Sequence, residues 1–344
     1  MKKINKILIC KLKFHGDMLL TTPLIATLNH LYPEAKIDIL LYKETKSLLS
    51  ADKRINTFYE IEKTPSLVKK VANFFNVRSA LKKKNHDIII NLTDQWPIAL
   101  LLASLNQYSI AFKRGKKTWN RLFTKVVPSQ GEHIIEQNLS ILQALDVPEN
   151  KLIKTLSLYY NESDYQSLFT IDSSFNSNKY VVIQPTARQP FKCWDDEKFA
   201  ALINKLHHDG LDVMLTSGPS TEDLAQVKRI AALCQRPPNS QFAGKTTFLQ
   251  LAALIDHAEL YIGVDSAPMH MAAALDIPQV CMFGATNYKQ WRPWSDKATV
   301  LWAGNYQKMP ERRHLDRSKK YLSCIPADDV IHEAEVLLNK FATR

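Results

Sequence analysis

Short apolar runs alternate along the chain with longer segments in which apolar residues recur every three or four positions. Each short run predicts a buried strand, and each longer segment predicts a helix. The predicted strands cover 6–12, 36–42, 87–92 and 109–112 and, after a polar stretch at 173–178, also 180–185, 211–216, 259–264 and 279–283. Strands that alternate with helices favour parallel sheets with helices on both faces. The pattern therefore predicts two doubly wound α/β domains that divide near residue 173.

Length, charge and cysteine content narrow the class of protein. The 344 residues suffice for two domains, and the formal net charge is +11. An excess of positive charge favours anionic partners: nucleic acid, a phosphorylated sugar or nucleotide, or an anionic membrane. The five cysteines are scattered without disulfide or zinc-site spacing, which is typical of a protein in the reducing cytoplasm.

The apolar runs are too short for insertion into a membrane. The N-terminal run covers only Ile7 to Cys10 before a lysine follows, which is too short for a signal peptide. The longest run, 98–105, falls short of the ~20 residues that a spanning helix needs. We therefore expect a soluble or peripheral protein.

The first predicted strand leads into the segment KFHGDMLLTTP. Gly16 permits a tight turn, Asp17 follows it, and Thr22 with Pro23 predicts the cap and first position of the next helix. Ligands of open parallel sheets bind beyond the carboxyl ends of the strands, so Asp17 lies where a general base would act. A turn aspartate, or the cap of a short extra turn, is the alternative interpretation. His15 is a second candidate, with an ordinary loop histidine as its alternative.

Two loops of the second domain carry groups suited to a nucleotide. Thr186, Arg188 and Lys192 precede a predicted helix at 195–207, and a hydroxyl, a guanidinium and an ammonium suit a phosphate. A solvated basic loop is the alternative. After the next strand, residues 220–223 resemble a capping box, and Glu222 is not needed for the cap and could accept hydrogen bonds from a ribose diol.

The segment YIGVDSAPMHMAAAL carries the strongest of these signals. A buried strand ends at Asp265, and the small residues 266–268 open a helix whose free N–H groups suit a phosphate. His270 in the first turn adds a donor, although Asp-Ser before a helix is also a common cap. Gly284 and Thr286 follow the next strand and would face the same crevice.

The sequence shows no Ser-His-Asp order, Walker lysine loop or zinc motif. GxGxxG is absent after both first strands, which argues against a dinucleotide oxidoreductase. The basic run KRGKKTWNR, 113–121, reads by default as a solvated surface loop. Nucleic-acid binding is the alternative, and no recognisable nucleic-acid motif supports it.

Four segments together resemble the lipopolysaccharide core heptosyltransferases, the ADP-heptose family of GT-B glycosyltransferases. They are KFHGDMLLTTP, QPTARQPFKCW, SGPSTED, and GVDSAPMHMAAA with FGAT. The combination of KFHGD, INLTDQW, FKCW and AGNYQKMP looks most like the type III branch of the family, which adds a branching heptose to the second heptose of the inner core. The resemblance runs nearly end to end.

The resemblance implies a GT-B architecture, in which two Rossmann-like domains face each other across a cleft. An N-terminal domain, 1–172, would bind the acceptor, and a C-terminal domain, 173–326, would bind ADP-heptose. A final helix within 327–344 would cross back to the first domain. The implied reaction is inverting and uses neither a metal nor another cofactor. The implied partners are ADP-heptose, a phosphorylated inner-core acceptor and the inner face of the inner membrane, where the cytoplasmic protein would be peripheral; no nucleic acid is expected.

The resemblance also assigns roles to residues. Asp17 falls where the family has its general base, Lys192 matches the lysine that contacts the donor phosphate, and Glu222 matches the ribose-binding acid. The other donor-binding candidates are Thr186, Arg188, Asp265, Ser266, Ala267, His270, Gly284 and Thr286. We assign acceptor binding to His15 and to the cations of the basic run, Lys113, Arg114, Lys116, Lys117 and Arg121, because they suit a polyanionic acceptor.

Two other classes stay open on the sequence. One is another enzyme of the same fold, either a heptosyltransferase of type I or II or a nucleotide-sugar epimerase, which would convert its sugar nucleotide without an acceptor. The other is a non-catalytic nucleotide- or nucleic-acid-binding protein, which would bind RNA in a salt-sensitive manner and release no ADP.

Overall fold

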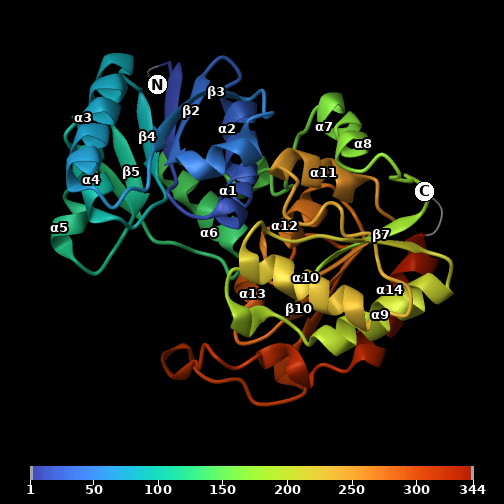
Figure 1. Cartoon of the computed structure of the whole chain (residues 1–344). Coiled ribbons are helices and arrows are strands. Elements are labelled where there is room, and N and C mark those ends of the chain that lie inside the picture. The colour runs from blue at the N-terminus through green and yellow to red at the C-terminus, as the bar shows by residue number, and fades with distance from the viewer. Residues whose placement is uncertain (1–2, 342–344) are drawn as a thin grey trace. The chain divides into compact units, whose positions relative to one another are not determined.

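The computed structural model describes residues 3–341, which form two compact α/β units, 1–157 and 158–344 (Figure 1). The second unit begins earlier than the predicted residue 173, because the segment after Ser157 bonds to helices of that unit. The Tyr160 hydroxyl donates to Asp256 at 2.7 Å, and the Gln250 amide donates to Ser167 at 2.8 Å. Residues 158–172, including α7 (Glu162–Gln166) and α8 (Leu168–Ile171), thus belong to the second unit.

The first unit is built on a six-stranded parallel sheet in the order β3-β2-β1-β4-β5-β6. Its strands are β1 (Lys6–Cys10), β2 (Lys36–Tyr42), β3 (Ile55–Ile61), β4 (Ile88–Asn91), β5 (Ser109–Phe112) and β6 (Lys125–Val127). The four predicted strands of this region are confirmed as β1, β2, β4 and β5. This strand order is that of a Rossmann fold, in which the chain reverses direction across the sheet between β1 and β4.

Helices cover both faces of this sheet. They are α1 (His15–Leu19), α2 (Thr22–Leu31), α3 (Leu67–Lys84), α4 (Trp96–Ala103), α5 (Lys117–Asn120) and α6 (Ile134–Leu139). Leu8 and Cys10 of β1 join one core with buried residues of α3 and α4. Lys11, the next residue, points to the opposite face and donates to Asn138 of α6 at 3.1 Å. The unit is therefore doubly wound, as predicted.

The second unit has a five-stranded parallel sheet in the order β11-β10-β9-β7-β8. Its strands are β7 (Tyr180–Gln184), β8 (Asp212–Leu215), β9 (Leu260–Val264), β10 (Gln279–Phe283) and β11 (Ala298–Trp302), and the four predicted strands are confirmed as β7 to β10. Alternate residues of β7 face opposite layers: Val181 packs into the core beneath α9 (Asp196–His208), whereas the Tyr180 hydroxyl donates to Leu254 of α11 (Phe248–Asp256) at 2.8 Å.

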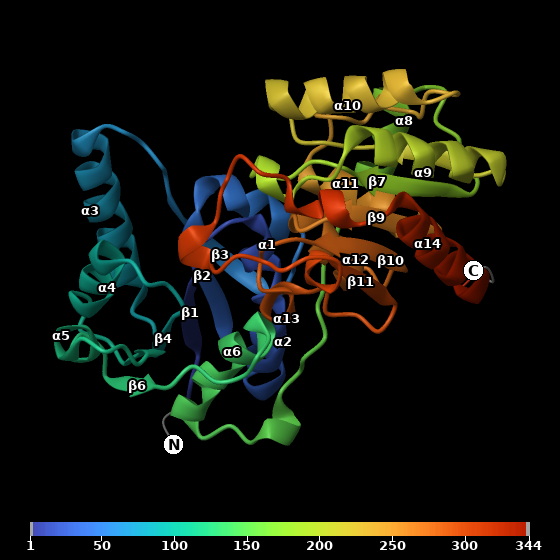
Figure 2. The ribbon, with the colours of Figure 1, turned by 90° about the horizontal axis from the view of Figure 1, so that it is seen from below.

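The last helix, α14 (Ala327–Phe341), packs on α9, β9 and β10 of the second unit (Figure 2). Val330, Ala334 and Leu337 are its buried residues. The predicted segment 327–344 ends in three residues that lie outside the described chain, and its return to the first domain stays a prediction. Within residues 3–341 we find no helix that is both long and apolar enough to cross a membrane.

Each sheet has one point at which the strand order reverses, between β1 and β4 in the first unit and between β7 and β9 in the second. Loops that leave neighbouring strands there run in opposite directions, so a crevice opens at the carboxyl edge and usually holds the ligand. The predicted site residues follow these strands and therefore lie at the carboxyl edges of the two sheets.

Candidate functional site

The loop after β7 is fixed by a buried chain of hydrogen bonds. The Thr216 hydroxyl donates to the Gln184 side-chain oxygen at 2.8 Å, and the Gln184 amide donates to the Thr186 hydroxyl at 2.8 Å. Thr186 is therefore buried and oriented by its own strand. Arg188, two residues on, is exposed.

An ion pair joins this loop to the one after β9. The Lys192 ammonium lies 2.6 Å from the Asp265 carboxylate, and the two side chains are 25% and 10% exposed. Two loops that the sequence singled out separately thus meet at the strand reversal. The pair holds the ammonium at the edge of the sheet while leaving part of it open to solvent.

Helix α12 (Ala267–Ala274) begins directly beside this pair. Ser266 stands at its N-cap in extended conformation and, among the described residues, its side chain makes no capping bond. Pro268 needs no hydrogen bond at the first turn, and the other first N–H groups point out of the helix. His270 is buried one turn in. This end of the helix and Lys192 together suit an anion such as a diphosphate.

The remaining predicted donor residues lie along the same edge. Glu222 is exposed in the first turn of α10 (Thr221–Leu233), where the Ser220 hydroxyl accepts from the Asp223 N–H at 3.1 Å and so acts as the predicted cap. Gly284 and Thr286 follow β10, and the Gly284 carbonyl accepts from the Trp302 indole at 3.1 Å. The candidates therefore follow four adjacent strands, β8, β7, β9 and β10.

The sequence predicts Asp17 in the loop between the first strand and the next helix. The structure instead places it inside the short helix α1. The cap of α2 is also one residue earlier than predicted, at Thr21, whose hydroxyl instead donates to the Asp17 carbonyl at 2.9 Å. Helix α1 and the bond from Thr21 fix the backbone that carries the Asp17 carboxylate. His15 donates from Nε2 to the Glu44 carbonyl at 2.9 Å, and burial lowers its pKa.

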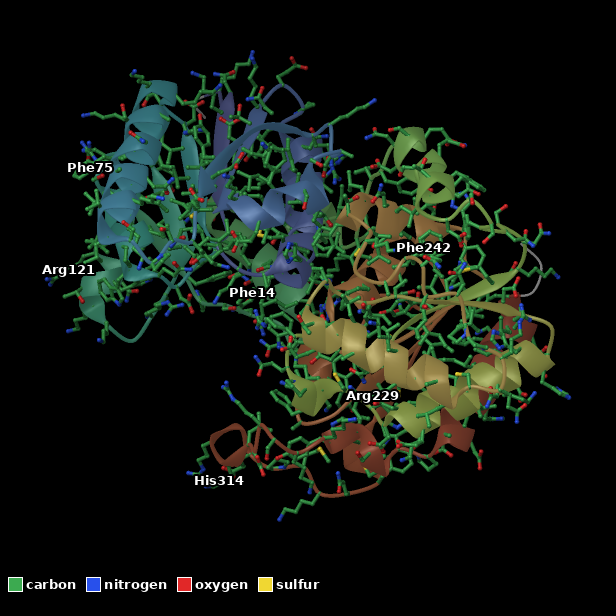
Figure 3. The ribbon with its side chains drawn as sticks, viewed as in Figure 1. Phe14, Phe75, Arg121, Arg229, Phe242 and His314 are labelled. Carbon is green, nitrogen blue, oxygen red and sulfur yellow. The ribbon has the colours of Figure 1, made fainter. Side chains whose placement is uncertain are left out.

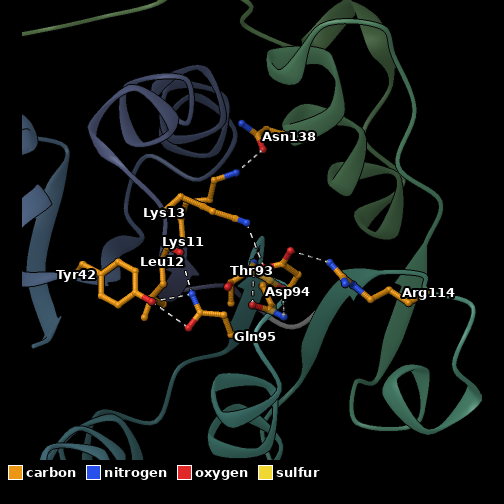
Figure 4. A network of polar contacts seen from close by, with 10 residues as sticks. Lys11, Leu12, Lys13, Tyr42, Thr93, Asp94, Gln95, Arg114 and Asn138 are labelled. Carbon is orange, nitrogen blue, oxygen red and sulfur yellow. Dashed lines mark hydrogen bonds and ion pairs between the residues drawn. The ribbon is translucent and has the colours of Figure 1, made fainter. Parts of the chain in front are cut away.

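A buried lysine that we did not predict accompanies Asp17. Lys11 is 3% exposed, and burial lowers its pKa to about 8, while the nearby charge of Asp17 acts in the opposite direction. Its ammonium donates to Asn138, as Figure 4 shows. The available signal was its position: Lys11 continues the alternation of Ile7 and Ile9 on a strand buried on both faces.

A second cluster, also not predicted as a site, follows β4. Asp94 lies 3.2 Å from the Lys13 ammonium and 3.7 Å from the Arg114 guanidinium (Figure 4). Burial alone would raise its pKa, but the hydrogen bond from Lys13 and both positive charges hold the pKa of Asp94 below its usual value. The Gln95 amide donates to the Leu12 carbonyl at 3.1 Å. The carboxyl ends of β1, β4 and β5 are thereby tied together.

The basic run extends this edge. All five of its cations are exposed, and Arg121 is labelled in Figure 3. The Arg114 guanidinium lies 4.8 Å from the centre of the Trp119 ring, and a pocket of about 420 Å³ is lined by Trp96, Arg114, Gly115, Lys116 and Trp119. Aromatic rings beside cations suit an anionic sugar.

Across residues 3–341, no cluster of three or more His, Cys, Asp or Glu side chains is placed to hold a metal ion.

The class of protein is defined by two Rossmann-like units, one of which places the Lys192–Asp265 pair and the start of α12 at the carboxyl edge of its sheet. The model of glycosyltransferase family 9 (heptosyltransferase) matches residues 74–322, and the chain belongs to this family. It is therefore a glycosyltransferase, and the resemblance found from the sequence motifs is confirmed.

Known proteins support this placement. The chain is 47% identical to lipopolysaccharide heptosyltransferase 3 of Escherichia coli, over 96% of this chain and 99% of the relative. The solved family 9 glycosyl transferase of Veillonella parvula has a TM-score of 0.85 at 21% identity and covers 98% of this chain and 99% of its own. The E. coli ADP-heptose lps heptosyltransferase II has a TM-score of 0.79 at 23% identity, with 97% and 99% covered. Both structures share the fold with this chain.

Proposed function

We propose that the protein transfers heptose from ADP-heptose to the second heptose of the lipopolysaccharide inner core, with inversion at the anomeric carbon. The observation that carries the proposal is the Lys192–Asp265 ion pair at the start of α12, because this pair holds the Lys192 ammonium in position to bind the diphosphate. The relative named lipopolysaccharide heptosyltransferase 3, 47% identical, supports the acceptor class.

The second unit binds the donor in this proposal. Lys192 and the first N–H groups of α12 receive the diphosphate, and Glu222 accepts hydrogen bonds from the ribose. When the bond between the anomeric carbon and the diphosphate oxygen breaks, ADP leaves with the electron pair and its negative charge grows. Lys192 and the helix terminus stabilise that charge, and this chemistry needs no cofactor beyond the donor itself.

In this proposal the first unit binds the acceptor and supplies the general base. The acceptor hydroxyl attacks the anomeric carbon on the face opposite the leaving ADP, and Asp17 takes the proton as the new bond forms. A single displacement of this kind inverts the configuration. Lys11 stays positive below a pH of about 8 and keeps an attractive charge beside the Asp17 carboxylate.

Lys11 gives the reaction an expected alkaline limit. Because burial lowers its pKa to about 8, the positive charge is present below that pH and is lost as the pH rises through it. We expect kcat/KM to fall above pH 8 in the wild type. In Lys11→Met, kcat/KM is expected to be low already at pH 7 and to show no such limb. The exposed Lys36→Met serves as a control, and an unchanged alkaline limb in Lys11→Met would refute the assignment.

The basic run is expected to act on the acceptor alone. Exposed cations raise association with a polyanion, and this steering weakens as the Debye length falls from ~10 Å at 0.1 M to ~3 Å at 1 M salt. Replacing Lys113, Arg114, Lys116 and Lys117 together by Ser should lower kcat/KM for the acceptor and flatten its salt dependence, with the donor KM unchanged. Steady-state kinetics at several ionic strengths measure both. Wild-type acceptor kinetics would show that these residues are only a solvated face.

A deletion strain tests the proposed function in the cell. Mass spectrometry of its core oligosaccharide should show the loss of one heptose, which the wild-type gene restores and a gene encoding Asp17→Asn does not. Nuclear magnetic resonance of the restored linkage should give the anomeric configuration opposite to that of the donor. An unchanged core in the deletion strain would contradict the proposal. In this proposal the protein works at the cytoplasmic face of the inner membrane, because its acceptor is anchored in lipid. The net charge of +11 suits an anionic membrane surface.

A further inference from the structure

Helix α3 of the first unit exposes apolar side chains to solvent along one face. The exposed fractions are 75% for Leu67, 79% for Val68, 54% for Val71 and 59% for Phe75. At about 100° per residue these four positions fall within a sector of about 100°. Figure 3 labels Phe75 on the outward side of the helix. We call these four residues the α3 face.

The fold anchors this helix from Phe74 onward, where the partly buried Phe74 packs against the core of the first unit. Val77 and Leu81 are buried in the core of the first unit, and Arg78 donates to the Ser104 hydroxyl at 2.7 Å. Within the described helix, residues 67–76 include no fully buried side chain. Residues 67–72 are all exposed, so the first part of the helix extends along the surface with its apolar residues open to solvent.

Charge identifies the kind of surface that would cover the α3 face. The helix sequence LVKKVANFFNVRSALKKK contains no Asp or Glu, and its cations are Lys69, Lys70, Arg78, Lys82, Lys83 and Lys84. Apolar residues flanked by lysines are typical of helices that lie in the headgroup region of an anionic bilayer. Such a face would repel its own equivalent in a symmetric dimer, which argues against a second copy as the partner.

The neighbouring helix also exposes apolar side chains. α4 packs beside α3 and exposes 52% of Leu100 and 38% of Trp96, one turn apart, and it carries no charged residue. Tryptophan prefers the boundary between headgroups and acyl chains.

We propose that the α3 face docks the protein on an anionic lipid bilayer by inserting its apolar side chains among the headgroups. The inference rests on the proposed function, which requires a lipid-anchored acceptor, and it names the part of the chain that reaches the lipid.

Sedimentation of the full chain with vesicles of phosphatidylethanolamine and phosphatidylglycerol tests the docking. The combined variant Leu67→Ser, Val71→Ser, Phe75→Ser should lower the partition coefficient about hundredfold. Lys69→Gln, Lys82→Gln and Lys83→Gln should each lower it about fivefold at low salt. The control variant Leu233→Ser, Val336→Ser alters exposed apolar residues of the second unit and should bind as the wild type does. Thermal melting confirms that each variant is folded.

A second measurement locates the contact. Phe75→Trp should shift its emission to the blue and be quenched by brominated lipids, whereas Leu233→Trp should not. The proposal is overturned if the wild type fails to bind these vesicles, or if the apolar variant binds as well as the wild type. Loss of self-association in that variant, with vesicle binding unchanged, would instead make the α3 face a contact between copies of the chain.

The docking and the proposed function can be tested independently of each other. With a delipidated, soluble core oligosaccharide as acceptor, the apolar variant should transfer heptose at the wild-type rate. Vesicle binding without any transfer by the wild type would refute the proposed function and leave the docking intact.

Discussion

Asp17→Asn is expected to lower kcat by about 10²–10⁴-fold, the usual contribution of a positioned base. Asparagine has the same shape as aspartate but cannot accept the proton of the acceptor hydroxyl. The backbone carbonyl of residue 17, which accepts the Thr21 hydroxyl, is unchanged by the substitution, so α1 should keep its position. Steady-state kinetics measure the loss, and calorimetric titration with ADP should give the wild-type affinity because the proposed donor residues belong to the second unit.

The matched control for this variant is Asp146→Asn. Asp146 is an exposed carboxylate of the same unit, with a positive φ of 54° that asparagine also tolerates. It should leave kcat unchanged. If Asp17→Asn retained activity within a few-fold of the wild type, Asp17 would not be the base, and the alternative of a structural turn residue would hold.

Lys192→Ala is expected to lower kcat by about 10²–10³-fold, as the loss of one preorganised transition-state donor typically does. It should also weaken ADP-heptose binding about tenfold or more, because the same ammonium meets the diphosphate in the ground state. The variant leaves Asp265 without its 2.6 Å partner, which adds a repulsive charge to the site. The exposed Lys228→Ala on α10 is the control, and unchanged kcat and donor affinity in Lys192→Ala would show that Lys192 is a surface residue.

The ion pair also predicts how the Asp265→Asn variant and the double variant should behave. If Asp265 acts by holding Lys192, Asp265→Asn should be impaired as well, and the double variant should be little worse than Lys192→Ala alone. Effects that multiply would instead mean that the two residues act independently.

The strands that the sequence pattern missed are β3, β6 and β11, and all three are edge strands. A central strand of a parallel sheet is buried on both faces and is therefore a continuous apolar run. The edge strand β3 is half-buried along most of its length, and polar residues interrupt its apolar pattern. β11 is half-buried along all of its length and contains one polar residue, Thr299. All central strands were therefore predicted, whereas β8, an apolar run at the edge of the second sheet, was the only edge strand that the pattern found.

The candidate site shows a similar division. The donor loops were predictable because each follows a strongly apolar strand and carries groups suited to a phosphate. The Lys192–Asp265 pair was not, since it joins residues far apart in the sequence and depends on the strand order β7-β9. Lys11 was missed because the sequence shows only a lysine that interrupts an apolar run. Its bond to Asn138 and the charge of Asp17, which make its burial possible, depend on the fold.

The most direct test of the central claim is transfer by the purified protein. The reaction contains ADP-heptose and a core acceptor that lacks the branching heptose, and mass spectrometry follows the acceptor while ADP is quantified. We expect the acceptor to gain the mass of one heptose for each ADP released. Conversion of ADP-heptose to an epimer without an acceptor, or an acceptor of unchanged mass, would contradict it.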